Sequence, residues 1–157
     1  MYTFLIVLIS ILLENIFNIY LTSIPYIIPL FTLLSLIFIY PKYKKDKYKY
    51  YFISFIIGLI YDIFFTDFYI VNACLFLLIS IFIYYILNNH KINIFTILTA
   101  CIFSIFLYNI LIYLILNFFN YTNYSLMDLS YILRNFLLIN IIYTILLYQV
   151  FKKRYKI

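Results

Sequence analysis

Apolar residues occur along this chain in six stretches of roughly membrane-spanning length, and this pattern limits the fold more than any single motif. The stretches cover residues 3–21, 23–40, 50–66, 68–87, 92–116 and 129–151. Each is near the about 20 residues that a helix needs to cross a bilayer. None shows the sustained two-residue alternation of a membrane-spanning strand. The sequence therefore predicts an all-α polytopic membrane protein, with six transmembrane helices in one bundle formed by residues 1–157.

The composition agrees with a membrane setting. Hydrophobic residues make up 68% of the chain and charged residues 10%, which leaves too little polar surface to cover a water-soluble core. The net charge of +6 is concentrated in short blocks beside the apolar stretches. Such blocks favour membrane orientation and contact with anionic lipid over nucleic-acid binding.

Basic residues outside the apolar stretches predict the orientation of the bundle. The loop between the second and third stretches contains five of them: Lys42, Lys44, Lys45, Lys47 and Lys49. The others follow the fourth stretch (Lys91) and the sixth (Lys152, Lys153, Arg154 and Lys156). With six crossings all of these lie on one side, and basic loops stay cytoplasmic. We therefore expect both termini in the cytoplasm, with the five-lysine loop as a candidate contact for anionic lipid or a cytoplasmic partner.

Glu14, Asp62 and Arg134 are ionisable residues inside the apolar stretches. A charged side chain at the centre of a membrane helix costs about 2.5–3.5 kcal/mol on insertion scales, so such residues tend to have partners. In the predicted orientation all three fall in the outer half of the membrane, where they can meet. Two interpretations stay open: a polar cluster that holds the bundle together, which we favour, and a substrate or proton site.

Gly58 is the only glycine of the chain and stands four residues before Asp62. This spacing puts both residues on one face of a helix. A glycine lets a neighbouring helix approach closely, and the Asp62 carboxylate needs a hydrogen-bond partner, for which Arg134 or an asparagine is expected. Asn72 and the other asparagines of the stretches are expected to form interhelical hydrogen bonds. The sequence thus predicts a packed contact within the membrane at Gly58 and Asp62.

No arrangement of residues predicts catalysis or a bound cofactor or metal. The chain contains no P-loop, GxGxxG, GxSxG or HExxH pattern. His90 has no Cys, Asp or Glu at ligand spacing. Cys74 and Cys101 lie within apolar stretches, where cysteine acts as a small apolar residue. We therefore expect a protein that is not an enzyme.

The sequence GLIYDIFF at residues 58–65, followed by IVNA at residues 70–73, resembles the core signature of the bacterial rod shape-determining protein MreD family. That family has a GL-x-x-D-I stretch, a short turn, and a G-x-N-A-like stretch that opens the next span. Here Ile70 stands in place of the usual glycine. Pro29 near the start of the second stretch and the basic tail also fit the family pattern.

The resemblance implies a non-enzymatic scaffold of the cell elongation machinery in the bacterial cytoplasmic membrane. Such a scaffold binds MreC, with the MreB filament, RodA and a class B penicillin-binding protein nearby, and helps to position peptidoglycan synthesis and maintain cell shape. The family fold is similar to the substrate-binding subunits of energy-coupling-factor vitamin transporters, so such a subunit is the alternative. The predicted turns at residues 22–23 and 66–67 are too short for a lid over a vitamin, and only the loop at residues 117–128 has the length, which favours the scaffold.

Overall fold

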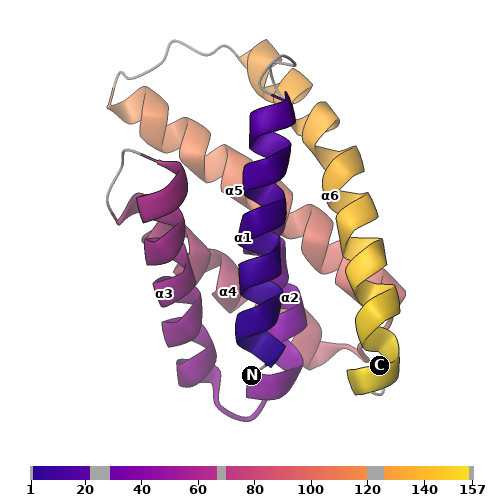
Figure 1. Ribbon diagram of the computed structural model, residues 1–157. Coiled ribbons are helices and arrows are strands. Elements are labelled where there is room, and N and C mark those ends of the chain that lie inside the picture. Colours follow the sequence, from indigo (N-terminus) through magenta and orange to yellow (C-terminus); the bar gives the residue numbers. More distant parts are fainter. Residues whose placement is uncertain (1, 22–28, 67–69, 120–125, 156–157) are drawn as a thin grey trace.

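The computed structural model describes residues 2–21, 29–66, 70–119 and 126–155, with side chains for residues 3–20, 29–66, 70–119 and 137–152. The described chain is all-helical, as predicted, and contains no strand (Figure 1). Its helices are α1 (Tyr2–Leu21), α2 (Phe31–Tyr43), α3 (Lys47–Phe65), α4 (Val71–Asn89), α5 (Ile94–Phe118) and α6 (Leu126–Tyr155). The predicted turn at 22–23 lies outside the described residues, as do Asp67 of the turn at 66–67 and residues 120–125 of the loop at 117–128. The last three residues of that predicted loop already belong to α6.

Four of these helices, α1, α3, α4 and α5, are long and apolar enough to cross a membrane. Helix α2 and the part of α6 with described side chains, Leu137–Lys152, are shorter apolar helices. The structure therefore supports a membrane protein with several spanning helices. The boundaries of α1, α3, α4 and α5 lie within a few residues of those predicted from the apolar stretches.

Helix α2 differs most from its prediction. An apolar stretch over residues 23–40 was expected to be one span, but the helix begins at Phe31 and ends at Tyr43. Its 13 residues give a length of about 20 Å, less than the about 30 Å of the hydrocarbon core. The start has a local cause, because Pro29 has no N–H to donate and disfavours helical geometry in the residue before it.

Helix α2 forms the centre of the bundle. It packs against each of the other helices, and every residue from Phe31 to Tyr40 is buried. In Figure 1, α1 crosses in front of α2, with α3 on one side and α6 on the other. A helix that is apolar on all sides is the kind that becomes a buried core helix.

The start of α1, the end of α6 and the lysine-rich turn lie together at one end of the molecule, the lower end in Figure 1. Lys42 Nζ, in the last turn of α2, donates to Thr3 Oγ1 of α1 at 3.3 Å. The Phe38 ring of α2 contacts the Phe151 ring of α6, with centroids 6.2 Å apart. We call this the basic end, because the α2–α3 turn brings its lysines here.

Candidate functional site

Asp62 of α3 accepts hydrogen bonds from the beginning of α4. Its Oδ1 accepts from the main-chain N–H of Asn72 at 3.2 Å and from the Asn72 side-chain amide at 2.8 Å. Its Oδ2 accepts from the main-chain N–H of Ala73 at 3.1 Å, and the Thr66 hydroxyl donates to Oδ1 at 3.1 Å. The first N–H groups of a helix lack partners within it and carry the positive end of its dipole. The carboxylate of one helix thus caps its neighbour.

Gly58, one turn before Asp62, contacts the same part of α4. A Cβ atom at this position would lie 2.5 Å from Ala73 Cα and 2.8 Å from the main-chain oxygen of Asn72. Both are backbone atoms, so any side chain here would force the two helices apart. Gly58 therefore lets α4 come close enough for Asp62 to bind its N–H groups, and the neighbour packed on this face is a helix of the same chain.

Ile70, the residue just before α4, has an unusual backbone. Its φ angle is 74°, and it is the non-glycine residue with positive φ in the described part of the chain. A β-branched residue rarely adopts this left-handed conformation, which costs about 1–2 kcal/mol. The bonds from Asn72 and Ala73 to Asp62 hold the strained turn in place.

Glu14 of α1 caps the central helix in the same way. It is fully buried, and its Oε2 accepts from the main-chain N–H of Thr32 at 2.8 Å. Asn140 of α6 adds a second acceptor, because its Oδ1 accepts from the main-chain N–H of Leu30 at 2.9 Å. The N-cap residue Leu30 has no side-chain acceptor of its own. Side chains from α1 and α6 therefore stabilise the start of α2.

Two tyrosines connect the caps of α2 and α4. The Tyr61 hydroxyl donates to Glu14 Oε1 at 2.9 Å, and the Tyr108 hydroxyl donates to Asn72 Oδ1 at 2.8 Å. Both tyrosines are buried. The resulting group, which we call the capping network, consists of Glu14, Tyr61, Asp62, Asn72 and Tyr108. It joins helices α1, α3, α4 and α5.

Most residues singled out in the sequence lie in or beside this network. Glu14, Asp62 and Asn72 belong to it, Gly58 packs directly beneath it, and an asparagine is indeed a partner of Asp62. Arg134 belongs to α6, but its side chain lies outside the described residues.

The five lysines at the α2–α3 turn lie at the basic end, away from the capping network. Lys49 Nζ lies 3.2 Å from Asp46 Oδ2, the ion pair found among the described side chains. The tail residues Lys153, Arg154 and Lys156 have side chains outside the described residues.

Tyr61 and Tyr108 were not recognised from the sequence. The chain has 20 tyrosines, so no single tyrosine stands out by residue type. The one usable signal was position, because Tyr61 directly precedes Asp62 and a polar hydroxyl in an apolar stretch needs a hydrogen-bond partner. Its pairing with Glu14 joins residues 47 apart in the chain, and helical periodicity carries no information on such a pair.

The chemistry available to this site is that of helix capping. Each buried carboxylate accepts from main-chain N–H groups, which compensates for its removal from water. Among the described residues, no three His, Cys, Asp or Glu side chains lie close enough together to hold a metal ion. No protein-family model, no curated protein and no solved structure matches the chain.

Proposed function

We propose that this protein is a non-enzymatic scaffold of the bacterial cell elongation machinery, which binds MreC and helps to position peptidoglycan synthesis. The observation that supports this function is the junction of α3 and α4. The two short stretches that resemble the MreD signature meet there: Gly58 lies against the backbone of Ala73, and Asp62 caps α4. Residues that are separate motifs in the sequence thus act as one structural unit.

The backbone of Ile70 adds support to the family assignment. Glycine takes positive φ angles without steric cost, so a glycine is the residue normally found at such a position. The MreD family has a glycine at this position. In this chain the backbone is left-handed there although the residue is isoleucine. A strained backbone is expected where the local geometry has a role of its own. Here the turn directs the first N–H groups of α4 toward the Asp62 carboxylate.

The proposed arrangement in the cytoplasmic membrane has six crossings and both termini in the cytoplasm. In this proposal the bundle has the fold that the MreD resemblance implies, which is similar to the substrate-binding subunits of energy-coupling-factor transporters, without their transport role. The basic end then faces the cytoplasm, as the positive-inside rule requires. The capping network fixes several helices relative to one another, so the bundle offers partner proteins a rigid surface, with exposed apolar residues such as Phe4 and Phe118 at the lipid boundary.

Depletion of the protein in its native bacterium tests the function. We expect cells to become round or wide, because wall synthesis loses its position, and we expect MreC to co-purify with the protein in mild detergent. Cells that keep their shape but require an added vitamin would replace the scaffold with the transporter-subunit interpretation.

The same pull-down tests the α3–α4 junction. Asp62→Leu removes the cap of α4, with four hydrogen bonds, each worth about 0.6–2 kcal/mol as an intramembrane polar contact, and disturbs the partner surface at this junction. MreC recovery should fall more than expression does. The control is Asp46→Leu, which changes an exposed aspartate at the basic end. Full recovery with Asp62→Leu at matched protein level would remove this junction from the proposal.

A further inference from the structure

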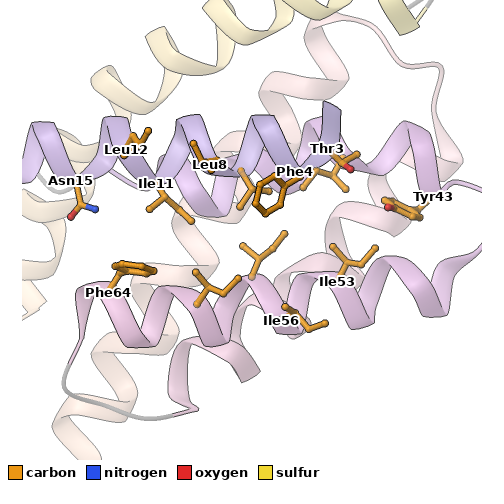
Figure 2. Close-up of a pocket in the computed structure, with 14 residues that line it drawn as sticks. Thr3, Phe4, Leu8, Ile11, Leu12, Asn15, Tyr43, Ile53, Ile56 and Phe64 are labelled. Atoms are coloured by element: carbon orange, nitrogen blue, oxygen red, sulfur yellow. The ribbon is translucent and has the colours of Figure 1, made fainter. Parts of the chain in front are cut away.

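A groove runs along the outside of the bundle between α1 and α3 (Figure 2). Both helices pack on α2, and the space left between them has a volume of 720 Å³. Its walls are apolar side chains of the two helices, among them Leu8 and Ile11 of α1 and Ile53 and Ile56 of α3, and Ile39 of α2 contributes to its floor. Its volume falls within the usual range for small-molecule sites.

The two ends of the groove differ in chemistry. Thr3 and Tyr43 line it at the basic end, and Asn15 lines it at the far end (Figure 2). Lys42 Nζ lies 3.3 Å from Thr3 Oγ1 and 5.2 Å from the centre of the Tyr43 ring. An exposed ammonium group is therefore held between two groove-lining residues, at the mouth of an otherwise apolar groove. The α2–α3 turn adds further exposed lysines, such as Lys44 and Lys45, to the same end.

The length of the groove corresponds to one leaflet of a bilayer. Its α1 wall extends from Thr3 to Asn15, which at 1.5 Å per residue is about 18 Å. The hydrocarbon core is about 30 Å thick, so one leaflet contributes about 15 Å. A lipid whose headgroup lies beside Lys42 would therefore extend its acyl chain along nearly the whole groove.

We propose that this groove binds an acyl chain of one anionic phospholipid from the leaflet on the lysine side, with the headgroup phosphate at Lys42. The positive charge at the mouth selects for a negative headgroup. A partner helix fits less well, because the small residues Gly, Ala, Ser and Thr let membrane helices approach closely, and among the lining residues only Thr3, at the mouth, is one of them. A flexible acyl chain follows a surface of branched side chains. This site is independent of the proposed scaffold function.

Native mass spectrometry of the full chain in mild detergent tests the site, with phosphatidylglycerol and phosphatidylcholine of identical acyl chains as probes. We expect the wild type to retain phosphatidylglycerol several-fold better. Leu8→Trp fills the groove from α1 and should abolish retention of both lipids. Its control is Leu78→Trp on α4, since both leucines are 43% exposed and Leu78 does not line the groove. Ile56→Trp, which fills the groove from α3, should repeat the loss.

The headgroup contact is tested separately. Lys42→Gln should lower the preference for phosphatidylglycerol about fivefold, the effect of one lysine near an anionic surface. Lys152→Gln, which removes the same charge from α6 at the same end of the molecule, should leave the preference unchanged. Equal retention of the two lipids by the wild type, or normal retention by both groove-filling variants, overturns the proposal. Loss of a co-purifying membrane protein with lipid retention intact would assign the groove to a protein helix instead.

Discussion

At the scale of single residues, Glu14 and Asp62 show how this chain places carboxylates inside an apolar bundle. Each accepts from the main-chain N–H groups at the start of another helix, Thr32 for Glu14 and Asn72 and Ala73 for Asp62. These N–H groups need acceptors in any case, and the helix dipole favours negative charge there. The carboxylates and the N–H groups at the helix starts thus satisfy each other's need for a hydrogen-bond partner. The polar-cluster interpretation of the ionisable residues is the one that this geometry favours.

The left-handed Ile70 leads to a prediction at the same scale. Ile70→Gly relieves a backbone strain of about 1–2 kcal/mol in the folded protein. Glycine also raises the conformational entropy of the unfolded chain, which lowers the stability by about 0.5–1 kcal/mol. We expect a net gain of about 0.5–1 kcal/mol in the free energy of unfolding, measured by denaturation with sodium dodecyl sulfate in mixed micelles. Val71→Gly, one residue later and inside α4, should instead lose about 1 kcal/mol. A loss for Ile70→Gly of similar size would contradict the assigned strain.

At the scale of elements, α2 is the helix that organises the bundle. Its neighbours surround it, and its first turn receives acceptors from Glu14 and Asn140, which come from helices at opposite ends of the chain. Helices α1 and α6 are therefore held to the same short segment. Packing around α2 should contribute more to stability than packing at the lipid-facing surfaces of the long helices.

A pair of leucine substitutions tests this difference. Leu34 of α2 is fully buried, whereas Leu114 of α5 is 56% exposed. Leu34→Ala leaves a cavity in the core and should lower the free energy of unfolding by about 2–5 kcal/mol. Leu114→Ala removes the same atoms from a surface that contacts lipid. This substitution should change the free energy of unfolding by less than about 1 kcal/mol. The same detergent denaturation measures both, and equal effects would show that α2 is not the core helix.

The apolar stretches predicted α1, α3, α4, α5 and α6 to within a few residues and α2 poorly, for a physical reason. The stretches at residues 3–21 and 92–116 end where polar residues begin, so composition marks their limits. In a membrane, a helix that faces lipid and a helix enclosed by other helices are equally apolar, so hydropathy did not show that the helix covers only the later part of the stretch at residues 23–40. Likewise, the spacing of Gly58 and Asp62 revealed a shared face, but the pairing of Glu14 with Thr32 depends on how distant helices pack.

At the scale of the whole molecule, the described residues are strongly asymmetric along the bundle. The lysine-rich turn lies at one end, and the capping network lies far along α1 and α3 from it. Asp62 comes late in α3, the helix that begins at Lys47, a separation of about 22 Å at 1.5 Å per residue. The charged groups of the basic end are therefore well separated from the buried carboxylates.

Reporter fusions test the orientation that this asymmetry favours. Fusions at Lys45 and at Ile157 should both report a cytoplasmic location, because the basic loops stay inside. A fusion at Asn117, near the end of α5, should report the external side and serves as the control. An external signal at Lys45 or Ile157 would contradict the predicted orientation.

The separation of Glu14 from its donors has a consequence for biosynthesis. Asp62 precedes its main-chain donors by only 10 and 11 residues, whereas Glu14 precedes Thr32 by 18 and Tyr61 by 47. Ribosomes add residues from the amino end, so Glu14 is synthesised before both of the groups that donate to it. The α3–α4 pair closes locally as soon as it emerges. Glu14 of α1 is therefore made first, yet its two hydrogen bonds are complete only once α3, which contains Tyr61, is in place.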